Sequence, residues 1–144
     1  MNATNMKPEP ETAPLREFIF SRGIAGFPEA SHFAFIYQGT GHLLCLQSLD
    51  QPEASFILTP WDQTRLGQPP ELSKEQRKCL KVSPQEEILW MIVLNPFADK
   101  TWVTANLKAP IAISEEKQTG LQCILNDHTL ELRHHWMLQP NSAP

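Results

Sequence analysis

The sequence predicts a mostly β protein: a small antiparallel β-barrel-like single domain with one short helix. Eight or nine short runs of β-favouring residues follow one another, with turn residues roughly every 8–12 positions. The 13 prolines among 144 residues, about 9%, exceed the usual ~5% and favour turns over long helices. The clearest helix start follows Ser73, so a single short helix is expected.

The length and the two ends of the chain indicate one domain. A chain of 144 residues can bury roughly two-thirds of the surface that it would expose when unfolded, which is enough for one core. Residues 1–14 hold three prolines and no periodic pattern, so they are expected to form a flexible tail. The barrel domain is then expected over residues 15–137, followed by a second tail over residues 138–144.

The first half of the domain is predicted to be strands joined by tight turns. The expected strands cover residues 17–20, 33–37, 42–47 and 54–59. After the first strand, Gly23 and Gly26 allow backbone angles that other residues resist, and they are expected to form a turn that carries Phe27. The second and third strands flank Gly39-Thr40-Gly41, which is the spacing of a β-hairpin.

The second half is predicted to hold the helix and the remaining strands. The helix is expected over residues 74–80, and strands over residues 87–94, 102–107, 111–113, 121–125 and 130–136. Ser73 and Gln76 have the spacing of a capping box, and residues 60–70 form at most one helical turn. Residues 87–94 are apolar on both faces, so they are expected to be the most buried strand. Pro110 has no N–H for a sheet and indicates a strand end, an edge or a bulge.

Composition excludes several classes of function. The net charge is −4 and no cluster of Lys and Arg is present, which disfavours direct binding of nucleic acid. The longest apolar run, residues 88–94, is far shorter than the ~20 residues that span a bilayer. No secretory signal is recognised, so a cytoplasmic location is expected, and the three scattered cysteines do not indicate a disulfide framework.

Catalytic and metal-binding patterns are not found in the sequence. It contains no Gly-x-Ser-x-Gly elbow, no phosphate-binding loop, no His-Glu-x-x-His and no Cys-x-x-Cys. His134 and His135 are adjacent and would point to opposite faces of a strand, so they are not expected to share a metal ion. The expectation is a protein that is not an enzyme and has no cofactor or metal. A small β-barrel that binds a small molecule, or an enzyme on that fold, is the alternative.

Four segments, in order along the chain, resemble the flagellar assembly factor FliW family. They are Gly-Ile-Ala-Gly-Phe at 23–27, Leu-Gln-Ser-Leu-Asp-Gln-Pro at 46–52, Ala-Asn-Leu-Lys-Ala-Pro-Ile at 105–111, and Gly-Leu-Gln at 120–122 together with Arg-His at 133–134. They span about residues 17–137. Ala25 stands where the family usually has proline, and Pro28 replaces a typical acidic residue.

The resemblance implies a non-enzymatic partner switch. Members of this family bind flagellin and the RNA-binding translational regulator CsrA, and binding to CsrA relieves repression of flagellin translation. This chain is accordingly expected to act as a monomer with these two protein partners. Among the family segments, the polar side chains expected to reach a partner are those of Gln47, Asp50, Asn106 and Lys108. The residues expected to be needed for the fold are Gly23, Gly26, Phe27 and Pro110. A requirement of the fold would also be enough to explain why Asn106 recurs in the family.

Overall fold

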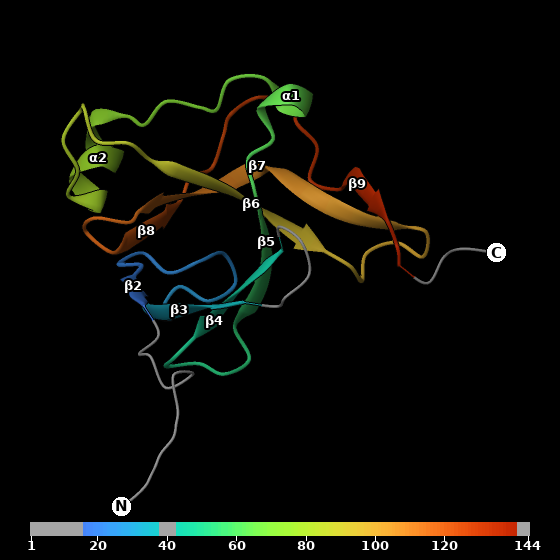
Figure 1. Ribbon diagram of the computed structural model, residues 1–144, viewed down its shortest axis with the longest axis horizontal. Helices are drawn as coiled ribbons and strands as arrows, with labels where there is room; N and C mark the ends of the chain where they lie inside the picture. The colour runs from blue at the N-terminus through green and yellow to red at the C-terminus, as the bar shows by residue number, and fades with distance from the viewer. Residues whose placement is uncertain (1–15, 38–42, 141–144) are drawn as a thin grey trace, which may run out of the picture.

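The computed structural model describes residues 16–37 and 43–140 (Figure 1). Within them the chain forms strands with two short helices between β5 and β6. The elements are β2 (Glu17–Ile19), β3 (His32–Tyr37), β4 (Leu44–Ser48), β5 (Ser55–Pro60), α1 (Gln63–Leu66), α2 (Lys74–Leu80), β6 (Leu89–Asn95), β7 (Trp102–Ser114), β8 (Thr119–Gln122) and β9 (His134–Leu138). The tail predicted over residues 1–14 and the loop Gly39-Thr40-Gly41 lie outside the described residues.

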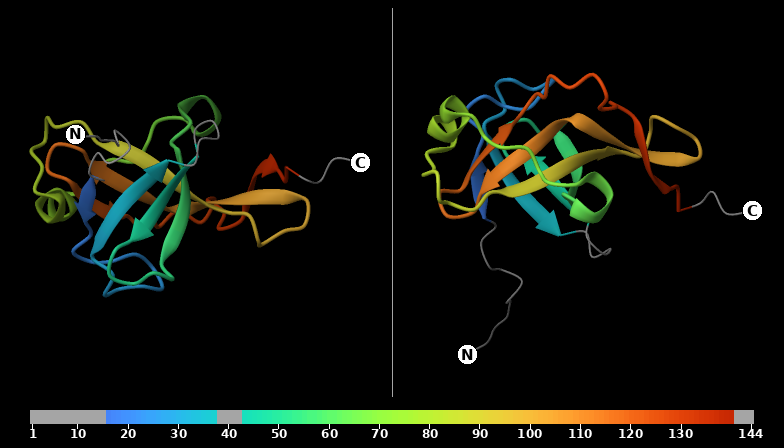
Figure 2. Two further views of the ribbon diagram at one scale, coloured as in Figure 1. Left: turned by 60° about the horizontal axis from the view of Figure 1, so that its bottom comes forward. Right: turned by 90° about the horizontal axis from the view of Figure 1, so that it is seen from above.

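The strands close into a barrel. The sheet order is β6-β5-β4-β3-β2-β8-β7-β9, and an additional pairing of β6 with β7 closes seven of these strands on themselves. All neighbours are antiparallel except β2 and β8, which meet in parallel through Ile19 and Thr119. The long β7 forms part of the barrel wall and extends beyond it, where β9 pairs with it outside the barrel (Figures 1 and 2). The predicted fold class is therefore confirmed, with one parallel contact in an otherwise antiparallel barrel.

β7 corrects the expectation of two strands separated by Pro110. It is one strand of 13 residues with a large bulge opposite β6. Val93 pairs with Asn106 and Met91 pairs with Ile111, so residues 107–110 all stand opposite one residue of β6. A bulge leaves residues out of the hydrogen-bond ladder, and the missing N–H of Pro110 falls among them. The bulge expected from this proline is confirmed, whereas the strand break is wrong.

The barrel interior is a single aromatic and aliphatic core. Phe18, Phe33, Leu58 and Ile111 are among its buried side chains, and Phe20 and Phe33 pack edge to face with ring centroids 5.0 Å apart. A second cluster, which includes Leu80 of α2, lies on the outer side of the barrel. Residues 109–114 of β7 are all buried because Ile111 and Ile113 face the first cluster and Ala112 faces the second. β7 therefore contains the most buried stretch, and the prediction that residues 87–94 would be the most buried strand was wrong.

Each of the two helices is preceded by a residue whose side chain caps the first turn. α2 covers the predicted residues, and its capping box is complete: Gln76 N donates to Ser73 Oγ at 3.1 Å, and Ser73 N donates to Gln76 Oε1 at 2.8 Å. α1 is a second helix of one turn, capped by the Asp62 side chain, so the expectation of one helix is corrected to two. A four-residue helix is too short to show a periodic apolar pattern.

The C-terminal strands differ from prediction at their ends. β8 ends at Gln122, and β9 begins at His134 instead of residue 130. Between them the chain follows the β7 bulge without forming a strand: Cys123 N donates to Pro110 O at 2.8 Å, and Leu107 N donates to Glu131 O at 2.9 Å. β9 includes Leu138, one residue beyond the predicted end of the domain.

Candidate partner-binding surfaces

The first predicted pair of contact residues, Gln47 and Asp50, holds the loop between β4 and β5. Gln47 Nε2 donates to Ser48 O and Pro52 O, both at 3.0 Å, and so closes the loop on itself. Asp50 Oδ1 accepts from Ser48 Oγ at 2.7 Å, and its Oδ2 accepts from Ser31 N at 3.2 Å. These bonds, led by the one from Ser48, keep the pKa of Asp50 well below its ordinary value. Both side chains are engaged within the protein, and the exposed apolar residue of the loop is Leu49.

The second predicted pair, Asn106 and Lys108, lies in the β7 bulge. Asn106 Oδ1 accepts from Lys108 N at 3.0 Å, a donor that the bulge has removed from the ladder with β6. Lys108 Nζ donates to Asp127 O at 3.4 Å and so links the bulge to the segment that follows β8. Both side chains are half-buried. Among the described residues, no hydrogen bond or ion pair joins this pair to Gln47 or Asp50, and each pair is held by its own segment.

The Gly23–Phe27 turn is the tightest feature of the predicted structural set. Ile24 and Phe27 form a bridge in which Phe27 N donates to Ile24 O at 2.7 Å, with Ala25 and Gly26 at the tip. Gly26 has a φ of +90°, which suits the third position of a type II turn. Gly23 has a φ of +65°, and a Cβ there would lie 2.6 Å from Pro28 O. The Phe27 ring packs edge to face on Phe56 with centroids 5.9 Å apart, so this turn is anchored to the barrel.

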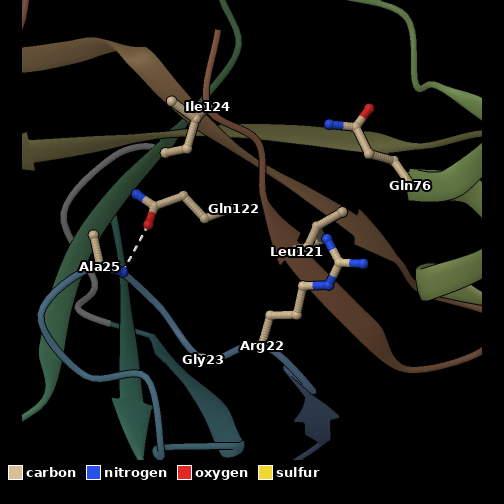
Figure 3. Close-up of a pocket in the computed structure, with 7 residues that line it drawn as sticks. All are labelled: Arg22, Gly23, Ala25, Gln76, Leu121, Gln122 and Ile124. Carbon is tan, nitrogen blue, oxygen red and sulfur yellow. Dashed lines mark hydrogen bonds between the residues drawn. The ribbon is translucent and has the colours of Figure 1, made fainter.

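A pocket of about 480 Å³ lies beside this turn (Figure 3). We name it the Arg22 pocket; its lining residues are Arg22, Gly23, Ala25, Gln76, Leu121, Gln122 and Ile124. Leu121 is buried, whereas the Ile124 side chain is 65% exposed. Gln122 Oε1 accepts from Ala25 N at 2.8 Å, and Gln122 Nε2 donates to Ala109 O at 3.2 Å. Alanine at position 25 keeps an N–H that proline would lack, and this N–H fixes the side chain of Gln122.

Sequence reasoning did not find the Arg22 pocket. Its residues come from the turn after β2, from α2, and from the end of β8 and the residues after it, and no spacing in the sequence relates these segments. Figure 3 shows Gln76 reaching in from α2, across the pocket from Ala25, while Arg22 extends beside Leu121. The sequence predicted a strand over residues 121–125, whereas β8 ends at Gln122 and leaves Ile124 exposed beside the pocket.

Several other titratable groups, among them Glu86, Lys117 and His134, make contacts within the protein. Glu86 Oε1 accepts from Lys117 Nζ at 2.8 Å, and this contact raises the pKa of Lys117. The same contact, together with a hydrogen bond from Ser114 Oγ, lowers the pKa of Glu86. His134 contacts Glu131 at 2.8 Å, whereas the ring of its neighbour His135 stacks on Trp102 with centroids 4.8 Å apart.

The described residues provide neither a metal-binding cluster nor a membrane-spanning helix. Across residues 16–37 and 43–140, no group of three His, Cys, Asp or Glu side chains is placed to hold a metal ion. The helices in the same ranges are all too short and too polar to cross a bilayer.

Comparison with known proteins identifies the family. The family model described as FliW protein matches residues 3–136. The chain belongs to the FliW family. A crystal structure of the flagellar assembly factor FliW superposes on this barrel with a TM-score of 0.73 at 26% sequence identity, covering 83% of this chain and 84% of that one.

Curated FliW relatives cover most of the chain. The flagellar assembly factor FliW of Thermotoga sp. strain RQ2 is 32% identical over 119 residues, which is 81% of this chain and 80% of that protein. The flagellar assembly factor FliW of Syntrophus aciditrophicus is 29% identical over 117 residues, or 81% of this chain and 74% of that protein. The resemblance found in the four sequence segments is thereby confirmed at the level of the FliW family.

Proposed function

We propose that this protein is a non-enzymatic flagellar assembly factor that binds flagellin and CsrA in the cytoplasm. The observation that carries the proposal is family membership: the FliW match extends over residues 3–136, and the curated relatives are named flagellar assembly factors. Binding to CsrA would relieve repression of flagellin translation, and accumulating flagellin would withdraw the factor from CsrA. Flagellin synthesis would thus follow flagellin export.

The switch requires that the two partners oppose each other. If flagellin weakens the binding of CsrA by some factor, linkage demands that CsrA weaken the binding of flagellin by the same factor. The net charge of −4 supports the CsrA branch, because an acidic surface attracts a basic RNA-binding protein and speeds their encounter. The perturbed carboxylates support a binding role over catalysis, because each is explained by hydrogen bonds within the protein.

Titration calorimetry with flagellin and CsrA from the same genome tests the proposal. We expect each partner to bind alone, and each dissociation constant to rise by the same factor when the other partner is saturating. Absence of binding to both partners would overturn the proposed function. Binding of both with no mutual effect would overturn the switch while leaving an assembly factor with two partners.

A further inference from the structure

The Arg22 pocket combines an apolar floor with hydrogen-bond donors that have no partner. Leu121 and Ile124 supply the apolar surface. In the described part of the chain, the exposed guanidinium of Arg22 makes no hydrogen bond and no ion pair. Gln76 uses its Oε1 in the capping box, so its Nε2 has no described partner. Gln122 uses both ends of its amide. The side-chain groups still available at the pocket are therefore donors, and they suit an acceptor that carries negative charge.

The neighbouring helix strengthens this preference for a negative ligand. α2 and its C-cap carry Lys74, Arg77, Lys78 and Lys81 against one acidic residue, Glu75. The chain as a whole has a net charge of −4, so α2 is a basic helix on an acidic protein. Lys74 and Lys78 are one turn apart on the exposed face of α2, and Gln76 of the same helix lines the pocket.

Charge separates the two proposed partners. CsrA binds RNA and is expected to present a basic surface, which the guanidinium of Arg22 and the lysines of α2 would repel. A flagellin segment that presents a carboxylate would be attracted to the same place. We propose that the Arg22 pocket is the flagellin-binding site, and that it takes a segment with an apolar side chain beside an Asp or Glu. The apolar side chain packs on Leu121 and Ile124, while the carboxylate pairs with Arg22.

This inference rests on the proposed function, because it assigns one of the two partners to a place on the surface. It also gives the switch a physical form, in which flagellin occupies the Arg22 pocket beside the basic helix α2 and CsrA approaches another part of the surface. The mutual opposition of the two partners then has to arise from coupling between separate surfaces, since like charge disfavours CsrA at this pocket.

The test measures flagellin and CsrA affinities for the full-length protein and three variants. Arg22→Glu reverses the charge at the pocket, and Ile124→Ser removes apolar surface without reversing charge. Arg133→Glu is the matched control, because it makes the same charge reversal on an exposed arginine that lies just before β9 and does not line the pocket. All three side chains are exposed, so unfolding by urea should be nearly unchanged and should serve as the check on folding.

We expect Arg22→Glu to weaken flagellin binding by roughly tenfold to a hundredfold and Ile124→Ser by roughly fivefold to tenfold. Arg133→Glu should change flagellin binding by less than about threefold, and CsrA affinity should not fall in any variant. Unchanged flagellin affinity in Arg22→Glu would overturn the assignment. Equal losses in Arg22→Glu and Arg133→Glu, or a loss confined to CsrA, would overturn it too. Lack of flagellin binding by the unmodified protein would instead reject the proposed function together with this site.

Discussion

At the scale of single residues, Gly23 and Gly26 are predicted to differ sharply although both have positive φ. Gly26→Ala should lower the free energy of unfolding by about 1–2 kcal/mol, the strain of the left-handed region, because no atom lies within 4 Å of the added Cβ. Gly23→Ala should cost more than about 2 kcal/mol, since its Cβ also meets Phe27 O and Pro28 O. Urea unfolding of the two variants measures both losses, and equal losses would contradict this account of the turn.

Asp50 is predicted to contribute to the pH dependence of stability. Its hydrogen bonds from Ser48, Ser31 and His32 lower its folded-state pKa, so the unfolded chain takes up the proton first as pH falls. The stabilisation should be fully present above about pH 4, the ordinary range of an Asp pKa, and should decline below it. The urea midpoint should therefore fall less steeply with acid in Asp50→Asn than in the unmodified protein.

The matched control for this pH dependence is Glu53→Gln. Glu53 is an exposed carboxylate close by in the same loop, and the structure gives it no hydrogen bond or ion pair. This variant should keep the steep dependence on acid. A slope in Asp50→Asn that equals those of the control and the unmodified protein would contradict the role assigned to Asp50. Some slope should remain in every variant, because Glu86, Asp99 and Asp127 also have lowered pKa values.

At the scale of elements, the β7 bulge is predicted to depend on the Asn106 side chain. Asn106→Ala removes the acceptor for Lys108 N and should lower the free energy of unfolding by about 1–2 kcal/mol. Asn106→Asp keeps an acceptor oxygen and should restore most of the loss. Urea unfolding measures this, and flagellin and CsrA affinities of the same variants address the expectation of partner contact. A fall in affinity with unchanged stability would contradict the structural role and favour direct contact.

The elements predicted correctly are those that depend on nearby residues. The start of α2 depends on a capping box between Ser73 and Gln76, which are only three positions apart in the sequence. Most strands are likewise located by runs of neighbouring β-favouring residues. Pro110 indicated a bulge, but whether β7 continues through it depends on β6, β8 and β9, which are distant in the sequence. The same reason explains the site: Gln47 and Asp50 were recognised from a local motif, whereas the pocket between Arg22 and Ile124 exists only after the barrel closes.

At the scale of the whole molecule, barrel closure leaves β9 as the strand with an unpaired edge among the strands of residues 16–37 and 43–140. The pairing of β6 with β7 removes the other edges, and β9 lies beyond β7 at the end of the sheet order. An exposed edge is a template for pairing with another chain, so proteins keep such strands short or place charge and proline there. β9 has five residues, and Pro140 follows it closely. These features favour a protected edge despite the exposed Leu138.

The protein is therefore predicted to be a monomer of 16.4 kDa in solution. A five-residue edge that ends near a proline offers few backbone hydrogen bonds to a second copy, and the two exposed apolar residues of β9, Met137 and Leu138, add little apolar area. Light scattering after size exclusion, over a range of protein concentrations, should give this mass throughout. Leu138→Glu should leave it unchanged, because there is no interface for the added charge to disrupt. A mass twice as large that returns to 16.4 kDa in Leu138→Glu would show instead that β9 joins two copies.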